Sequence, residues 1–129
     1  NLQYIIAVAL VDGAVSFADS HSYARMKDPQ IRAVQGRVQL VADPKLVDPV
    51  APRSGLVEVT LKDGRTVSHF TKFPPGTKEN PVSTEGLNAK VRDLMAPVLG
   101  AERTAKLIER MNALEAVRDV RDLRPLFTL

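Results

Sequence analysis

The sequence contains two histidines, the side chains best suited to proton transfer near neutral pH. His21 and His69 are far apart, neither stands in an HxH or HxxxH spacing, and the chain has no cysteine. A metal site and a cysteine nucleophile are therefore not expected. We expect His69 to be an exposed cross-strand partner of Glu58, and His21 to have a surface or capping role early in a helix. The residues themselves predict no catalytic group.

One polar cluster has the chemistry to contact a negatively charged substrate. It lies in the segment FPPGTKENP, residues 73–81, and includes Gly76 and Thr77. A mobile loop that presents the Lys78 ammonium and the Asn80 amide could contact a carboxylate. The alternative, which we favour, is a solvated turn before a helix. If the loop does bind a substrate, we expect Lys78 and Asn80 to be the residues that contact it.

Composition limits the classes of protein that fit. With 129 residues and 44% hydrophobic content, the chain suffices for one compact domain. Its net charge is only +3, basic and acidic residues are interleaved as in Arg118–Arg124, and aromatic residues are few, which argues against nucleic-acid binding. The sequence has no GxSxG, P-loop, GxGxxG or EF-hand pattern. We expect no cofactor, and the lack of cysteine suits a reducing, cytoplasmic setting.

The chain begins at Asn1 and continues directly into an apolar run, Leu2–Val11. This run is shorter than the about 20 residues of a membrane span and lacks the basic flank of a signal peptide, so we expect no membrane association. We expect an apolar helix without a cap before it, as if the sequence started within an element. Such a helix belongs in the interior of something larger.

Several further elements are expected in the first half of the chain. A second helix should run from a cap at Asp19 or Ser20 to about Lys27, and Asp28-Pro29 should start a short third helix. The alternation in Arg37–Ala42 predicts the first main strand. Asp43–Gly55, with three prolines, should be a long irregular connection.

The segment Leu56–Phe70 predicts a β-hairpin. Hydrophobic and polar residues alternate up to Asp63-Gly64, a pair that suits a two-residue turn. The register that such a turn sets would place Val57 opposite Phe70 and Glu58 opposite His69.

Two helices should complete the fold. Ser83 or Thr84 should cap the first, Pro97 should kink or end it, and Gly100 should close it before a second helix from Glu102 to about Val117. The predicted fold class is α+β, with a small antiparallel sheet that includes a β-hairpin and is packed against several helices.

With these elements in order, the chain resembles the C-terminal region of the MmgE/PrpD family, the family of 2-methylcitrate dehydratase. The resemblance covers nearly the whole length and depends on the order and spacing of four segments. These are LQYIIAVALVDG at Leu2–Gly13, DPQIRAVQGRVQLVADP at Asp28–Pro44, VEVTLKDGR at Val57–Arg65 and GTKENPVSTEGLNAKVRDL at Gly76–Leu94.

The resemblance implies a two-domain enzyme in which residues 1–129 form a lid-type domain and an all-helical N-terminal domain supplies most catalytic groups. Family activities include dehydration of 2-methylcitrate, decarboxylation of cis-aconitate and epimerisation of iminodisuccinate, without an iron–sulfur cluster. We therefore expect a parent that is a cofactor-independent lyase or isomerase acting on a small polycarboxylate, with a role in propionate metabolism. The chain alone is expected to be inactive and to associate as dimers or higher species through surface that normally meets the helical domain.

Few functional residues carry over from the family. An active-site His of relatives stands immediately before the stretch matching Asn1–Tyr4, outside this sequence. A functional Tyr of the decarboxylase branch corresponds to Ala42, which argues against a decarboxylase. The alternative to a lid domain is an autonomous binding or assembly module that keeps the fold without the chemistry.

Overall fold

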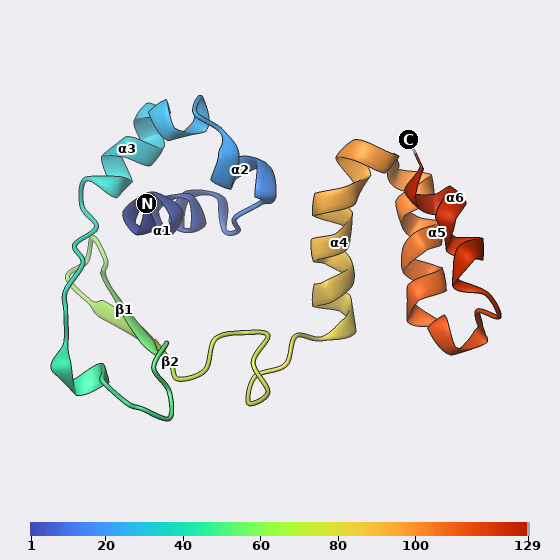
Figure 1. Ribbon diagram of the computed structural model, residues 1–129. Helices are drawn as coiled ribbons and strands as arrows, with labels where there is room; N and C mark the ends of the chain where they lie inside the picture. The colour runs from blue at the N-terminus through green and yellow to red at the C-terminus, as the bar shows by residue number, and fades with distance from the viewer. Residues whose placement is uncertain (129) are drawn as a thin grey trace. The chain divides into compact units, whose positions relative to one another are not determined.

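The computed structural model describes residues 1–128 and has an α+β fold, as predicted (Figure 1). The chain divides into two compact units, of which the first comprises Asn1–Leu40 with Glu85–Leu129 and the second is Val41–Thr84. The first unit contains the α-helices, and the second contains a two-stranded antiparallel sheet. None of the described helices is long and apolar enough to cross a bilayer.

Helix α1, Leu2–Asp12, has a cap at each end. The side chain of Asn1 accepts a hydrogen bond from the Tyr4 amide at 3.3 Å, which satisfies one of the free donors of the first turn. At the other end Gly13 adopts φ 78°, and its amide donates to the Ala9 carbonyl at 3.0 Å. The expectation of an uncapped helix was wrong, because asparagine is itself an effective N-cap.

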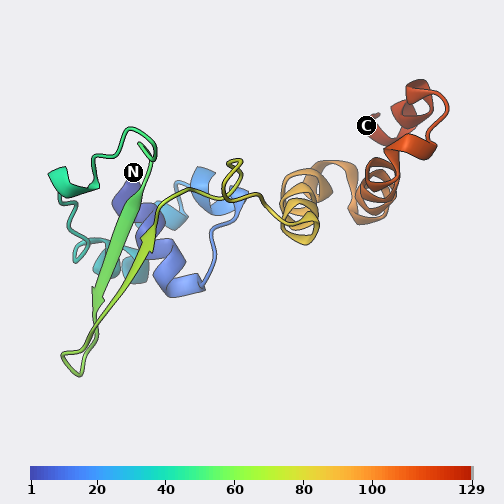
Figure 2. The ribbon, with the colours of Figure 1, turned by 90° about the horizontal axis from the view of Figure 1, so that it is seen from below.

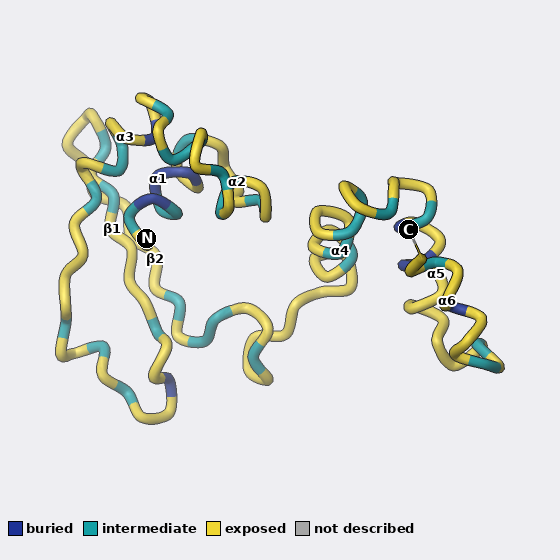
Figure 3. The backbone as a smooth tube through the Cα atoms, turned by 45° about the horizontal axis from the view of Figure 1, so that its top comes forward, coloured by how far each residue is buried: buried dark blue, intermediate teal, exposed yellow. Residues whose placement is uncertain are grey.

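The core of the N-terminal region lies between α1 and α3, Pro29–Gln35 (Figure 3). Asp28 caps α3 by accepting hydrogen bonds from the amides of Gln30 and Ile31, which confirms the predicted helix start at Asp28-Pro29. The residues buried in this core are Tyr4, Ala7, Val8 and Ile31.

The segment between these helices differs from the prediction. Helix α2, Phe17–His21, begins after Ser16, which forms a capping box with Asp19, so neither Asp19 nor Ser20 is the cap. The helix does not continue to Lys27, because the hydroxyl of Ser22 accepts from the Arg25 amide at 3.1 Å and starts a separate 3-10 turn, η1, Arg25–Lys27.

The strand predicted at Arg37–Ala42 is absent. In the described chain the sheet has only two strands, β1 (Gly55–Thr60) and β2 (Thr66–Thr71), and 37–42 pairs with neither. Alternation marks a sequence that can form a strand, but a strand also needs a hydrogen-bonded neighbour. The connection that follows is irregular, as predicted, apart from the short turn η2 at Pro44–Leu46.

The hairpin forms as predicted, but its register is shifted by one residue. Figure 2 shows the two strands of the hairpin side by side. In the observed register Leu56 pairs with Phe70 and Val57 with His69. The amide of Leu61 donates to the Arg65 carbonyl at 2.8 Å, so the loop is the three residues 62–64 rather than two. A two-residue type I′ turn needs positive φ at Asp63 as well as at Gly64, and here only the glycine, at 86°, has it.

The C-terminal helices are α4, Thr84–Leu99, and α5, Ala101–Asn112, with Gly100 between them at φ 81°. Helix α4 continues past Pro97 to Leu99, whereas α5 ends five residues before the predicted Val117. Short turns follow α5. They are η3 at Leu114–Ala116, η4 at Val120–Leu123 and α6 at Arg124–Phe127. The buried residues of this region are Thr104, Leu107, Ile108 and Leu123.

Candidate functional site

The loop that follows β2 is closed by its own backbone. The Gly76 amide donates to the Asn80 carbonyl at 2.8 Å, and the Asn80 amide donates to the Thr77 carbonyl at 3.2 Å. Gly76 has φ 90°, a conformation that glycine adopts without steric cost. The predicted polar cluster is therefore a defined turn rather than an extended strand.

The two candidate residues of this loop have different roles in the structure. Asn80 donates a side-chain hydrogen bond to the Phe73 carbonyl at 2.8 Å, so its amide NH₂ group already stabilises the loop. Lys78 is exposed and has no ion-pair partner within residues 1–128. Of the two, Lys78 is the freer to contact an anion.

A hollow of about 390 Å³ lies between the end of β2 and this loop. Asn80 lines it, but Lys78 does not. Other polar groups on its wall were not predicted as site residues. They are His69, Thr71, Lys72 and Glu79.

Lys72 supplies the positive charge of the hollow. Its Nζ lies 3.8 Å from Asp48 Oδ2 and 5.5 Å from the centre of the Phe73 ring. Both partners of the ion pair are exposed, and such pairs contribute at most about 1 kcal/mol. Lys72 can therefore exchange Asp48 for the carboxylate of a ligand at little cost.

The structure separates the two histidines. His69 pairs across the hairpin with Val57 rather than with Glu58, so its predicted role was wrong. That error came from the turn length, and with the correct register His69 is placed in the wall of the hollow. His21 is exposed, with Nδ1 2.9 Å from both the Phe17 carbonyl and the Ser20 hydroxyl, which agrees with a local surface role.

The hollow has a cationic group that could bind a carboxylate. Lys72 can neutralise an anion, whereas His69 has no hydrogen bond in the described chain that would fix its tautomer or orientation. Within the same part of the chain, no group of three or more His, Cys, Asp or Glu residues could hold a metal ion.

Comparison with known families shows to which family the chain belongs. The sequence model of the MmgE/PrpD C-terminal domain matches residues 1–115. The chain belongs to the MmgE/PrpD family. The matched region includes both histidines and the whole hollow, whereas residues 116–129 lie beyond it.

Curated MmgE/PrpD relatives carry two kinds of name. Cis-aconitate decarboxylase of Homo sapiens is 28% identical over 92% of this chain, and the mouse protein of the same name is 27% identical over 92%. The 2-methylcitrate dehydratase-like protein oryR of Aspergillus oryzae is 25% identical over 86%. The chain spans about a quarter of the length of each relative. The identities are too similar to separate a decarboxylase from a dehydratase.

Proposed function

We propose that this chain is the C-terminal, lid-type domain of a polycarboxylate dehydratase or isomerase that resembles 2-methylcitrate dehydratase. The observation that carries the proposal is the family match over residues 1–115, in a chain that spans about a quarter of its relatives. In this proposal a helical N-terminal domain supplies the catalytic groups, and the present domain covers them. The parent would be a cofactor-independent lyase or isomerase of cytoplasmic propionate metabolism.

The hollow beside β2 supports a role in substrate binding. Lys72 is on its wall and held only by an exposed ion pair, and Lys78 projects from the adjacent turn without a partner in the described chain. Two ammonium groups on neighbouring segments suit a substrate with several carboxylates. Asn80 has a positioning role, because its amide holds the turn that presents Lys78.

We infer that the isolated domain is inactive, because in this proposal the catalytic groups belong to the helical domain. We expect the purified 129-residue chain to show no turnover of 2-methylcitrate or cis-aconitate above a no-protein control. Turnover by the chain alone would contradict this part of the proposal. The coding sequence upstream of Asn1 tests the other part: a helical domain supports the lid, and a start codon supports an autonomous binding or assembly module.

The substrate contact is tested in the parent protein with the variant Lys72→Met. We expect KM to rise about tenfold, because the variant loses a hydrogen bond between the Lys72 ammonium and a substrate carboxylate. The change in kcat should be smaller. Lys62→Met is the matched control, because Lys62 is an exposed lysine in the hairpin loop and does not line the hollow. Equal KM values for the Lys72→Met variant and the wild type would remove Lys72 from the site.

A further inference from the structure

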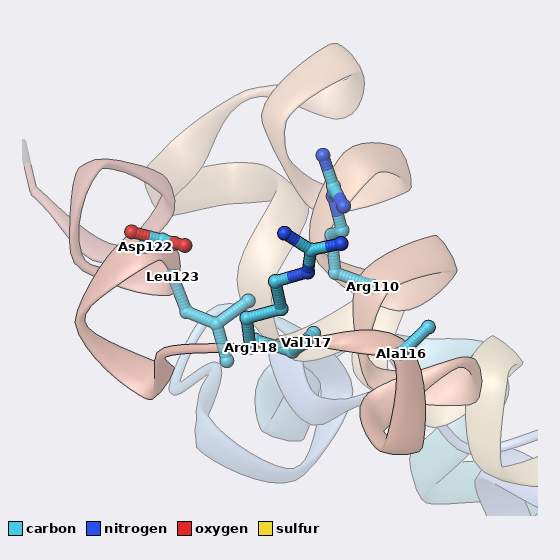
Figure 4. A pocket seen from close by; sticks show the side chains of 6 residues that line it. All are labelled: Arg110, Ala116, Val117, Arg118, Asp122 and Leu123. Atoms are coloured by element: carbon cyan, nitrogen blue, oxygen red, sulfur yellow. The ribbon is translucent and has the colours of Figure 1, made fainter.

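A second hollow lies in the C-terminal segment. Its volume is about 250 Å³, and it is formed where the end of α5 meets η3 and η4 (Figure 4). Leu123, which is buried, and the half-buried Val117 supply its apolar wall. Arg110, Arg118 and Asp122 supply its charged groups.

Within residues 1–128, the two arginines of this hollow have no ion-pair partner, unlike other cations nearby. Arg121 is paired with Asp119 at 2.5 Å and Lys106 with Glu102 at 2.7 Å. In the part of the chain that the structure describes, neither Arg110 nor Arg118 has an ion pair or a side-chain hydrogen bond. Figure 4 shows both guanidinium groups on the same side of the hollow, with the Asp122 carboxylate across from them.

Backbone hydrogen bonds hold this arrangement in place. The amide of Val117 donates to the Leu114 carbonyl at 3.0 Å, directly before Arg118, and the amide of Asp122 donates to the Asp119 carbonyl at 3.0 Å. Arg110 belongs to the last turn of α5. The charged groups therefore lie on a helix and on short turns closed by hydrogen bonds, rather than on an open loop.

We propose that this hollow binds a small anion with two or more negative charges through Arg110 and Arg118. Two guanidinium groups that face one space repel each other, and an anion between them removes that repulsion and accepts several charge-assisted hydrogen bonds. The chemistry required is shared by a phosphate and by a small polycarboxylate. Arg110 lies within the family match, whereas the other residues that line this hollow lie beyond it. None of them belongs to the hollow beside β2, so the two proposals can fail separately.

A substitution of Asp122 should change the affinity for the anion in the opposite direction to a substitution of either arginine. Its carboxylate lines the same hollow and has no ion-pair partner within residues 1–128, so it repels a bound anion. Replacing it with a neutral residue of the same shape should strengthen binding, whereas a loss of either arginine should weaken it.

The test is an NMR titration of the chain with inorganic phosphate and, separately, with citrate. We expect saturable shifts at the amides of residues 116–123 with at least one of the two anions, and the anion that binds identifies the ligand class. R110Q and R118Q should each weaken binding about tenfold or more, and D122N should strengthen it by about threefold.

The matched control is R121Q. It removes one positive charge from η4, but Arg121 does not line the hollow and is already paired with Asp119. We expect the affinity of R121Q to equal that of the wild type. The proposal is overturned if neither anion gives saturable shifts, or if R121Q weakens binding as much as R118Q, since binding would then follow net charge alone. Circular dichroism checks that each variant keeps the wild-type fold. If one of R110Q and R118Q fails to fold, the other still tests the proposal.

Discussion

Arg25 joins several elements of the N-terminal helical region through its ion pairs. Its guanidinium lies 2.5 Å from a carboxylate oxygen of Asp12 at the end of α1, and 2.5 Å from one of Asp28 at the start of α3. Asp19 of α2 is 4.0 Å away. The hydrogen bond with Asp12, followed by the charges of these carboxylates, raises the pKa of Arg25. Local sequence patterns do not predict this network, because its members come from separate elements.

Asp19 makes the stability of this region depend on pH. Its pKa is held below the ordinary value of 3.8, first by the Ser16 hydroxyl, which donates at 2.6 Å, then by the Ser16 amide at 3.0 Å, and also by the charge of Arg25. Since the folded-state pKa is lowered, the stabilisation is present above 3.8 and is lost as the pH falls through the folded-state value.

We therefore expect Asp19→Asn to lower the Tm at neutral pH and to make progressively less difference below pH 3.8. Thermal unfolding followed by circular dichroism across this range measures the effect. A difference between variant and wild type that is the same at neutral and acid pH would show that the Asp19 charge does not contribute.

At the scale of elements, the sequence predicts features that depend on neighbouring residues and misses those that depend on distant ones. Asp28-Pro29 fixes the start of α3 because the cap and the helix are contiguous. The strand expected at 37–42 needs a partner that the described chain does not supply. The candidate site was located only in part: Lys78 and Asn80 lie in the predicted turn, whereas the placement of His69 required the correct hairpin register.

The hairpin turn provides a test at this scale. Gly64 has φ 86°, and a Cβ built on it meets no atom within 4 Å, so the cost of a side chain is that of the backbone conformation alone. We expect Gly64→Ala to destabilise the hairpin by about 1 kcal/mol. Hydrogen exchange of the β1 and β2 amides measures this locally, without assuming that the whole chain unfolds as one unit.

Gly55→Ala is the matched control for the turn. Gly55 also has open space around its Cβ position, but its φ lies outside the left-handed region, so the substitution carries no such backbone cost. Equal exchange rates in the two variants would show that the left-handed glycine does not hold the turn.

At the scale of the whole molecule, α1 shows how the proposed domain would meet a partner. One face of the helix is buried against α3 through Tyr4, Ala7 and Val8. Leu2 and Leu10, two turns apart, remain 59% and 51% exposed on a second stripe. The helix is thus apolar on two sides, and only one of them is covered within the described chain.

We expect the stripe of Leu2 and Leu10 to pack against the helical domain in the proposed parent, and to be free to meet a second copy in the isolated chain. We expect the chain to form dimers or larger species in light scattering at high concentration, and Leu2→Gln combined with Leu10→Gln to shift it toward monomer. Val98→Gln combined with Val120→Gln removes two hydrophobic residues that are also exposed but lie on other helices, and should leave association unchanged.

A wild-type chain that stays monomeric contradicts self-association, and an equal effect of both double variants contradicts the role of this stripe. Loss of association in the first variant alone would identify α1 as the contact surface, because both pairs remove comparable apolar side chains and differ only in where they lie.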